Sequence, residues 1–371
     1  MKNVLSPLVF SRILFLFFAI AASYLIPQEV GYIGKQVAPD APYLTWVWAN
    51  FDGRHFLKIA TEGYKNFDFA FFPLYPLLIS IFGFSQPLYA GLIISLICFF
   101  SGLVILKKIV LLDFDKKIAD MAVFVACFFP LSFFYNSVYS DSLFFLVSVT
   151  SFYFARRREW AAAGFFAGLA SLTRLSGIAI LPALIVEWYL QNRGEYPIAK
   201  MPLPFLKNGF LAIVFGLMGV GGYMLGLTIF KGDPLLFQKS MVAWSQNGFV
   251  LPIHVIFRYL KIFTSVDYHL LVYWISILEF VSIFAYLGLA IYVWRKVRVS
   301  YAVFMIVLLL LVPVTGTFAG TPRYLLHLFP GFIAIALLVQ KNVWLKNSLI
   351  LLFLALGFAL TALFTRGYFV S

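Results

Sequence analysis

A polar stretch, WANFDGRHFLKIATEGY at residues 48–64, follows the first strongly apolar segment of a chain of 371 residues. In a helix that begins near Asp52, this carboxylate lies on the same face as Phe56 and Ile59, because side chains at this spacing project to one side. A carboxylate that is partly shielded from water accepts a proton more readily, as a general base must. We therefore predict a helix that ends at Gly63 and carries Asp52 as candidate base; the alternative is that Asp52 only caps the helix.

Other side chains near this stretch or in a later motif are suited to hold a polar substrate. His55 lies in the same expected helix and is assigned to substrate binding, although a histidine in this position is more often a packing or hydrogen-bonding residue. The sequence NSVYSDSLFF at 136–145 places Tyr139 and Asp141 between two apolar runs, as further substrate-binding candidates. Ser140 and Asp141 are also good capping residues for a helix that starts here, and the two roles are compatible.

The composition indicates an integral membrane protein. Hydrophobic residues make up 63% of the chain and charged residues only 12%, against roughly 25% charged residues in a soluble domain. No linker or low-complexity run divides it, so we predict one all-α domain over residues 1–371. The net charge of +13 comes from short basic clusters between apolar runs. This pattern is typical of membrane topology signals and disfavours a nucleic-acid partner.

About eleven apolar runs are candidates to cross a bilayer, for which about 20 residues are needed. They cover residues 8–27, 87–106, 118–137, 141–156, 160–173, 175–190, 207–230, 269–294, 299–318, 324–340 and 347–365. The stretch 70–84 is short and contains two prolines, so it either crosses the membrane or re-enters it, and the topology below assumes that it does not cross. With Lys2 in the cytoplasm, the dense basic clusters all fall on the cytoplasmic side. They are Lys107 and Lys108, Lys116 and Lys117, Arg156–Arg158, Arg193, Lys200 and Lys207, Arg295–Arg298, and Lys341 with Lys346.

Two isolated arginines break or open apolar segments. A straight helix over 159–190 would be about 46 Å long, so we predict two shorter helices that meet around Arg174 in LTRLSG. Arg174 and Arg323 are permanent cations whose planar donor groups suit a phosphate, and Tyr324 adjoins the second. As alternatives, Arg174 pairs with Asp52 or Asp141 only to hold helices together, and Arg323 anchors its helix by snorkelling to the membrane interface.

Two long loops fall on the outer, non-cytoplasmic side in this topology. The first, residues 28–70, holds the helix of Asp52, which we expect to lie along the membrane surface. The second, residues 231–268, holds Asp233 beside a turn signal and then an apolar stripe at helical spacing. This stripe predicts an amphipathic interfacial helix suited to a lipid with an anionic head, or else a plain surface helix between two spans. The isolated charges on the outer side suggest one polar site. They are Asp52, Asp141, Arg174, Asp233 and Arg323.

Several common kinds of site have no signature in the chain. No metal-ligand spacing, phosphate-binding loop, dinucleotide fingerprint or nucleophilic serine elbow occurs, so nucleotide chemistry is disfavoured and no cofactor is required. Asp52, Asp141 and Asp233 could share a divalent cation, but no spacing demands one. Cys98 and Cys127 lie in apolar runs and predict neither a disulfide nor a metal site.

Six short motifs, in order along residues 46–340, resemble those of a known family. They are DGRHFLKIATEGY, AFFPLYP, YSDSLF, LASLTRLSG, GDPLLFQKSMVAW and PRYLLHLFPGF. This series is similar to the GPI mannosyltransferase II (PIG-V) family and its bacterial relatives, which are multi-span glycosyltransferases of the GT-C fold. The chain departs from the eukaryotic pattern in having Phe51 where a tryptophan commonly precedes the aspartate, and Asp141 where glutamate is usual.

The resemblance implies a donor, an acceptor and a membrane side. The donor would be a polyprenyl-phosphate sugar, most simply mannose, and the acceptor a lipid-linked or glycan hydroxyl, with inversion at the anomeric carbon. The protein would lie in the cytoplasmic membrane of a prokaryote, with its site on the non-cytoplasmic side. The family's catalytic aspartate corresponds to Asp52. We choose Arg174 and Arg323 for the departing phosphate, and Asp141 and Asp233 for sugar or acceptor hydroxyls.

Two alternative functions stay open. One is a GT-C enzyme that uses another lipid-phosphate sugar, such as a pentose or glucose. The other is a flippase or transporter for a lipid-linked glycan or a small solute. Transporters usually show internal pseudo-symmetry and a polar site near mid-membrane. Here the only repeat is FFPL at 71–74 and 128–131, and the charges gather toward one face.

Overall fold

The computed structural model describes residues 2–30, 32, 40–193, 203–244 and 250–370, with side chains from residue 4 onward except between 203 and 208. Lys200, the side chains of Lys2 and Lys207, and short parts of both predicted outer loops lie outside the described residues. Within these residues the regular structure is entirely helical, which confirms the all-α class.

Five helices are long and apolar enough to cross a membrane, which supports an integral membrane protein. They are α1 (Lys2–Leu25), α5 (Pro87–Val110), α10 (Leu203–Lys231), α13 (Leu271–Lys296) and α17 (Val343–Thr365). A bent pair, Thr321–His327 with Phe329–Gln340, makes six if it counts as one span. The total of about eleven spans stays a prediction.

The chain divides into two compact units. Unit 1 comprises Met1–Val149 with Ile335–Val370, and unit 2 comprises Thr150–Ala334. Two helices, α7 (Asp141–Arg156) and α16 (Phe329–Gln340), have their ends in different units. Because two such units can form one domain, the single domain over 1–371 stays a prediction.

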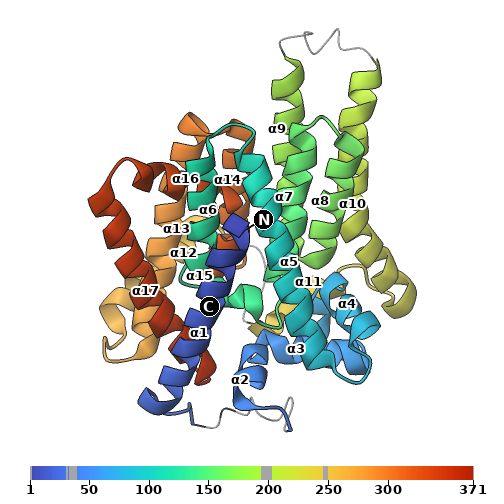
Figure 1. The fold of residues 1–371 in the computed structure, drawn as a ribbon. Coiled ribbons are helices and arrows are strands. Elements are labelled where there is room, and N and C mark those ends of the chain that lie inside the picture. The colour runs from blue at the N-terminus through green and yellow to red at the C-terminus, as the bar shows by residue number, and fades with distance from the viewer. Residues whose placement is uncertain (1, 31, 33–39, 194–202, 245–249, 371) are drawn as a thin grey trace. The chain divides into compact units, whose positions relative to one another are not determined.

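Unit 1 is built around α1, which packs along α17 and against α6 (Figure 1, blue against red and green). Phe15 and Phe18 of α1 contact Phe133 and Phe358, so large aromatic side chains fill this core. The other elements of unit 1 are α2 (Tyr43–Trp46), α3 (Asp52–Glu62), α4 (Leu74–Gly83), α6 (Lys116–Phe128) and 3-10 turns at Val47–Ala49, Asn66–Ala70 and Ser132–Asn136. The ten residues of α4 extend about 15 Å, half of a bilayer core of about 30 Å. This length fits the re-entrant interpretation of 70–84.

The predicted helix over 118–137 is wrong in its second half. α6 ends at Phe128, where Pro130 follows, because a proline disfavours helical backbone in the residue before it. The buried guanidinium of Arg12 donates to the carbonyl oxygens of Cys127 (3.1 Å) and Ser132 (2.8 Å) and to the Ser132 hydroxyl (2.6 Å). Arg12 therefore satisfies backbone groups that the broken helix leaves without helical partners.

Unit 2 contains a close pair of helices, α8 (Trp160–Thr173) and α10. Glycines allow this approach: a Cβ at Gly168 would lie 2.4 Å from the Phe215 carbonyl oxygen. Small residues at helix contacts are typical of membrane bundles. The other elements are the 3-10 turn Leu175–Ala179, α9 (Ile180–Asn192), α11 (Leu236–Ser240), the turn Met241–Trp244, α12 (Pro252–Ser265), α13, α14 (Val299–Val314), α15 (Thr321–Tyr324) and the turn Leu325–His327.

Candidate functional site

The helix predicted after the first apolar segment is present as α3, from Asp52 to Glu62, and Gly63 ends it with φ of 78°. Phe56 and Ile59 are buried on one face, and Asp52 is half-buried at the start of the helix. The N-cap position is occupied by Phe51, whose side chain makes no capping hydrogen bond. Asp52 is the first residue of the helix, so the alternative that it occupies the N-cap position is wrong.

The backbone that introduces Asp52 is strained. Phe51 has φ of 54°, a conformation that is uncommon for a residue with a side chain. Its N–H donates to the Tyr32 hydroxyl over 3.3 Å, and its ring packs against Phe364. The next glycine, Gly53, has no room for a side chain without crowding, because a Cβ would lie 3.2 Å from the Val138 carbonyl oxygen. Strain of this kind is often retained at functional sites.

Hydrogen bonds join three of the sequence motifs in unit 1. The Tyr139 hydroxyl donates to the Asn50 carbonyl oxygen over 2.7 Å, two residues before Asp52. The Val138 N–H donates to the Trp48 carbonyl oxygen over 2.9 Å. On the other side, Ser95 Oγ donates to the Tyr139 carbonyl oxygen over 3.4 Å and shares a 2.8 Å hydrogen bond with the Tyr75 hydroxyl of AFFPLYP.

Asp141 is fully buried as the first residue of α7, directly after this hydrogen-bonded loop. Its place at the start of a helix agrees with the prediction that Ser140 and Asp141 open one. A buried carboxylate is costly unless other groups stabilise it, which is compatible with a role in binding. The structure thus brings the segment of Asp141 and the segment of Asp52 together within unit 1.

His55 lies beside the carboxylate of Asp68, a contact that the sequence pattern did not reveal. Its Nδ1 lies 3.0 Å from Oδ1 of Asp68, and its ring stacks on Phe71 with the centroids 4.8 Å apart. Asp68 is buried, whereas the His55 side chain is 40% exposed. The signal that could have revealed Asp68 is a lone acidic residue within the aromatic run NFDFAFF. His55 is thus held in one orientation, with Nδ1 toward Asp68.

In unit 2 the predicted break around Arg174 is present. α8 ends at Thr173, Arg174 has extended backbone, and a 3-10 turn leads into α9. The turn doubles back closely, since a Cβ at Gly177 would lie 2.3 Å from the Ser171 nitrogen. The Arg174 guanidinium lies over the Tyr324 ring, 5.3 Å from its centroid, a distance at which cation–π attraction acts. Arg174 and Tyr324, which are 150 positions apart in the sequence, are therefore in contact.

The structure corrects the interpretation of Arg323 in two respects. Arg323 does not open the apolar helix, because it lies in the short α15, which is bent by 86° from α16. It also does not snorkel to an interface, because the residue is only 7% exposed. Gly320, with φ of 81°, provides the left-handed turn that starts α15. A buried guanidinium is better placed to bind an anion than to anchor a helix at a membrane surface.

Asp233 lies in the turn predicted at Gly232–Pro234. Its Oδ2 accepts from Lys239 Nζ over 2.6 Å, and its Oδ1 accepts from the Leu235 N–H over 3.0 Å. The hydrogen bond from Lys239 lowers the pKa of the Asp233 carboxyl, so this group is ionised at neutral pH. It can accept hydrogen bonds from hydroxyl groups but is a poor proton acceptor.

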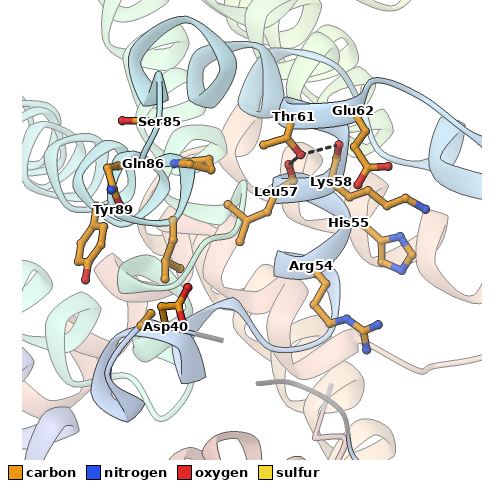
Figure 2. A pocket seen from close by; sticks show the side chains of 13 residues that line it. Asp40, Arg54, His55, Leu57, Lys58, Thr61, Glu62, Ser85, Gln86 and Tyr89 are labelled. Carbon is orange, nitrogen blue, oxygen red and sulfur yellow. Dashed lines mark hydrogen bonds between the residues drawn. The ribbon is translucent and has the colours of Figure 1, made fainter. Parts of the chain in front are cut away.

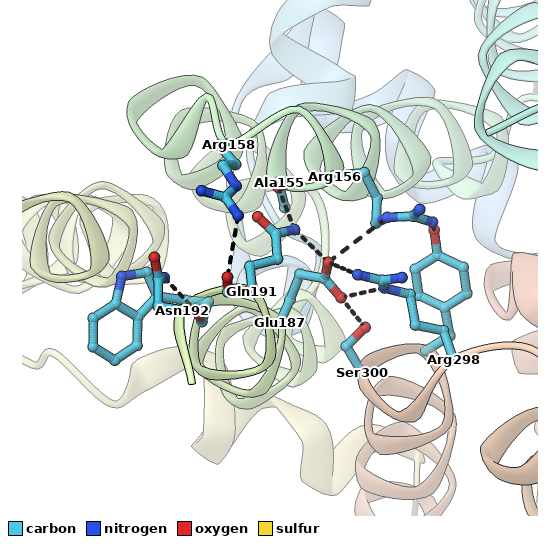
Figure 3. Close-up of polar contacts among 10 residues, drawn as sticks. Ala155, Arg156, Arg158, Glu187, Gln191, Asn192, Arg298 and Ser300 are labelled. Atoms are coloured by element: carbon cyan, nitrogen blue, oxygen red, sulfur yellow. Dashed lines mark hydrogen bonds and ion pairs between the residues drawn. The ribbon is translucent and has the colours of Figure 1, made fainter. Parts of the chain in front are cut away.

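Basic residues predicted to face the cytoplasm gather around a buried carboxylate, Glu187 of α9 (Figure 3). Arg298 donates from Nη2 to Oε1 over 2.6 Å and from Nε to Oε2 over 2.7 Å, and Ser300 donates to Oε2. Arg156 Nε lies 3.7 Å from Oε1. The sequence pattern did not reveal Glu187, whose carboxylate joins α9 to Arg298 and Ser300.

Within each unit the candidate residues and the basic clusters lie at opposite ends of shared helices. In unit 1, α3 and the first turn of α5 line the same hollow. Lys107 lies in the last turn of α5, about 30 Å from that first turn along the helix axis. In unit 2, Arg158 precedes α8 and Arg174 follows it, and its 14 residues extend about 21 Å. In each unit a dense basic cluster therefore lies at the far end of a helix from a functional candidate, although α3 itself also carries Arg54 and Lys58.

No group of three or more His, Cys, Asp or Glu side chains is placed to hold a metal ion among the residues that the structure describes. Cys98 and Cys127 are both free and buried.

Helices of membrane length with isolated charges at their ends define an integral membrane protein. The family model described as Mannosyltransferase (PIG-V) matches residues 2–190, just over half of the chain, and the chain belongs to this family. The matched segment contains α3, the YSDSLF loop and the Arg174 break.

Individual relatives are more distant. GPI mannosyltransferase pigv-1 of Caenorhabditis elegans is 30% identical over 122 residues, which cover 28% of this chain and 18% of that protein. The oligosaccharyltransferase of Archaeoglobus fulgidus, tethered with an acceptor peptide, aligns over 98% of this chain and 55% of its own, with 14% identity and a TM-score of 0.44. Its apo form aligns at 15% identity and a TM-score of 0.43.

Proposed function

We propose that this chain is a membrane glycosyltransferase that moves a sugar, by its family mannose, from a polyprenyl-phosphate donor to a hydroxyl of a lipid-linked or glycan acceptor. The observation that carries the proposal is the placement of Asp52. This half-buried carboxylate opens α3 after a strained residue, and the Tyr139 hydroxyl of the YSDSLF loop donates to the Asn50 carbonyl oxygen two residues before it. All of these residues lie in the segment that the mannosyltransferase family model matches.

In the proposed reaction, Asp52 removes the proton of the acceptor hydroxyl. The freed electron pair forms a bond to the anomeric carbon of the sugar, and the bond from that carbon to the phosphate oxygen breaks on the opposite side. The configuration inverts, and the lipid phosphate leaves with the electrons of the broken bond. Such a single displacement needs one base and a stabilised leaving group. It does not need a metal or any other cofactor.

The remaining candidates take binding or positioning roles in this proposal. Arg174 and Arg323 stabilise the departing phosphate, because fixed positive charge in a site with little water acts strongly on developing negative charge. Tyr324 positions Arg174 through the cation–π contact. Tyr139 positions the start of α3. The further substrate-binding residues are His55, Asp141 and Asp233.

The non-cytoplasmic location of the reaction is also part of the proposal. It is supported by the positive-inside rule, by which Lys and Arg collect on the cytoplasmic side of membrane helices. In each unit the candidate residues lie at the end away from the basic clusters, at Lys107 in unit 1 and around Glu187 in unit 2. We place the protein in the cytoplasmic membrane of a prokaryote, with membrane lipids around it.

The test is sugar transfer by the purified protein with radiolabelled polyprenyl-phosphate mannose, and with the corresponding glucose and pentose donors, in the presence of a membrane lipid extract. We expect transfer from the mannose donor, and its loss in Asp52→Asn without loss of folded protein. Asp267→Asn, at an exposed turn, is the matched control. Undiminished transfer by Asp52→Asn would contradict the assigned base. Movement of intact lipid across liposomes without transfer would favour a carrier.

A further inference from the structure

Residues 364–369 form a closed turn at the end of α17, called the α17 turn, which belongs to unit 1. Gly367 has φ of 89° and provides the left-handed residue of this turn. The Tyr368 N–H donates to the Leu363 carbonyl oxygen over 2.9 Å. The Gly367 N–H donates to the Phe364 carbonyl oxygen over 3.2 Å. This pair of hydrogen bonds is the Schellman motif, which gives the turn a defined shape.

The α17 turn is anchored by the segment that follows α1. The Arg366 side chain donates from Nε to the Ile26 carbonyl oxygen over 2.8 Å. The Arg366 carbonyl oxygen accepts from the Glu29 N–H over 2.9 Å. Its guanidinium also lies over the Tyr43 ring, 5.9 Å from the centroid, where cation–π attraction acts. These contacts involve no residue of α3, so the turn can serve as a support for that helix.

The α17 turn holds the residue two positions before Asp52. The Asn50 side chain donates from Nδ2 to the Phe364 carbonyl oxygen over 2.9 Å, while the Asn50 carbonyl oxygen accepts from the Tyr139 hydroxyl. Asn50 is fully buried, so water does not replace either hydrogen bond. Asn50 is thus held both by the YSDSLF loop and by the α17 turn.

The α17 turn also contacts Phe51, the strained residue directly before Asp52. The Phe51 ring contacts the rings of Phe364 and Phe369, with the centroids 5.8 and 5.9 Å away. It also contacts the Tyr32 ring, and the Tyr32 hydroxyl accepts from the Phe51 N–H. A strained backbone conformation persists only where the surrounding structure imposes it. These contacts are therefore the source of the conformation of Phe51.

Gly367 allows Tyr32 to reach this place. A Cβ at Gly367 would lie 2.5 Å from the Tyr32 ring, and a φ of 89° is unfavourable for a residue with a side chain. Tyr32 therefore packs directly on the backbone of the α17 turn. An alanine at position 367 would displace Tyr32, and the Phe51 N–H would lose its acceptor.

We propose that the α17 turn is a positioning element for the candidate base: it imposes the conformation of Phe51, which sets the place of Asp52 at the start of α3. The inference rests on the proposed function, in which Asp52 takes the acceptor proton. The rest of α3, from Arg54 to Glu62, lines a hollow with the start of α5, so the turn also orients this wall (Figure 2). The turn lies outside residues 2–190, which the family model matches.

Two variants weaken this support without a change in α3. Tyr32→Phe removes only the hydroxyl that accepts from the Phe51 N–H, and Gly367→Ala displaces the Tyr32 ring. We expect kcat for sugar transfer to fall several-fold in the first and at least about 10-fold in the second, because a displacement of about 1 Å can cost about 100-fold in rate. The donor KM should not change. A wild-type kcat in both variants would overturn the proposal.

The matched control is Gly357→Ala, in the same helix, where a Cβ would lie at an ordinary 3.6 Å from Phe15. It should keep the wild-type kcat. The double variant Y32F/G367A should have a kcat no lower than Gly367→Ala alone, because changes that act through one contact do not add. Fully additive losses would overturn the proposed route through Tyr32.

Hydrogen exchange of the purified full-length protein tests the support without any reaction. We expect faster amide exchange in residues 48–56 of Gly367→Ala, and wild-type exchange in α8 and α10 of unit 2. Unchanged exchange in residues 48–56 would overturn the proposal. Faster exchange throughout the protein would do the same, because the turn would then stabilise the whole fold rather than the start of α3.

The two proposals can fail separately. An inactive Asp52→Asn beside a wild-type kcat in both turn variants would overturn the positioning element and leave the transferase standing. A wild-type protein without transfer from any sugar donor would overturn the proposed function, and with it the role of the turn in that reaction.

Discussion

The hydroxyl of Tyr139 donates a 2.7 Å hydrogen bond to the carbonyl oxygen of Asn50, across 89 positions of the chain. This contact attaches the loop before α7 to the turn before α3. Both residues are buried, so water does not replace the hydrogen bond if it is lost. It therefore holds the start of α3, and with it Asp52, in a defined place.

Tyr139→Phe is expected to impair the proposed reaction and also to lower the stability of the protein. The variant leaves the buried Asn50 carbonyl without this donor, which costs about 1–3 kcal/mol of unfolding free energy. Because the start of α3 shifts, we expect kcat to fall more than the donor KM changes. Transfer kinetics and thermal unfolding in detergent measure the two effects. Tyr268→Phe, at an exposed tyrosine, serves as control. An unchanged kcat in Tyr139→Phe would show that Asn50 does not position the base.

The two arginines of unit 2 can be tested by exchange for lysine, which keeps the charge but removes the planar donor group. A hydrogen bond to the charged leaving phosphate is worth about 1.5–3 kcal/mol. Its loss in the transition state lowers kcat/KM by roughly 10- to 150-fold. We expect this loss in both Arg174→Lys and Arg323→Lys. Arg193→Lys, at the exposed end of α9, should be unaffected. The assay is transfer at varied donor concentration. If both variants kept the wild-type kcat/KM, these two arginines would not bind the leaving phosphate.

Elements with a strong local signal were predicted correctly from the sequence. The apolar face and terminal glycine of α3 predict its bounds, and the length of the apolar stretch at 159–190 predicts the break at Arg174. The amphipathic helix in the second predicted outer loop is present as α12.

Features that depend on distant residues were missed. Nothing near residue 128 indicates that Arg12 replaces the helical hydrogen bonds at the end of α6. Glu187 looks like one polar residue in an apolar helix until Arg298 is placed beside it. The burial of Arg323 follows from the bend between α15 and α16, and a hydropathy pattern does not reveal such a bend.

Glu187 is expected to stabilise the fold without taking part in the reaction. Glu187→Gln leaves Arg156 and Arg298 without their buried carboxylate, and removal of one partner of such a group costs about 3–5 kcal/mol. We expect a clear drop in Tm but unchanged activity per folded molecule. Glu159→Gln breaks an exposed pair with Arg157 and should cost no more than about 1 kcal/mol. A Tm equal to that of the wild type in Glu187→Gln would contradict this role.

Transfer is expected to be insensitive to chelation, because a lipid-phosphate leaving group can be stabilised by arginines alone. Transfer assays with and without EDTA measure this, and the rate should stay within twofold. A loss of activity that magnesium or manganese restores would contradict the cofactor-free reaction. It would also direct attention to Asp52 and Asp141 as ligands.

α12 is connected to the segment that precedes Arg323. It carries Ile253, Phe257 and Leu260 on an exposed face, which suits contact with the bilayer surface. From its other side, Arg258 donates to the Gly316 carbonyl oxygen over 2.6 Å. This hydrogen bond links α12 directly to the loop before α15.

Tyr259 of α12 also hydrogen-bonds to the loop before α15, and the variant Tyr259→Phe tests whether this link matters for the reaction. Its hydroxyl donates to Glu279 over 2.5 Å and accepts from the Phe318 N–H over 3.2 Å. Burial raises the pKa of Tyr259, so the hydroxyl stays protonated and keeps donating at any pH the protein meets. In Tyr259→Phe the loop loses its acceptor, and Arg323 is held less firmly. We expect the donor KM to rise several-fold and Tm to fall, because the buried Glu279 carboxylate also loses a donor, with Tyr273→Phe as control. A donor KM equal to that of the wild type would show that α12 and Arg323 act independently.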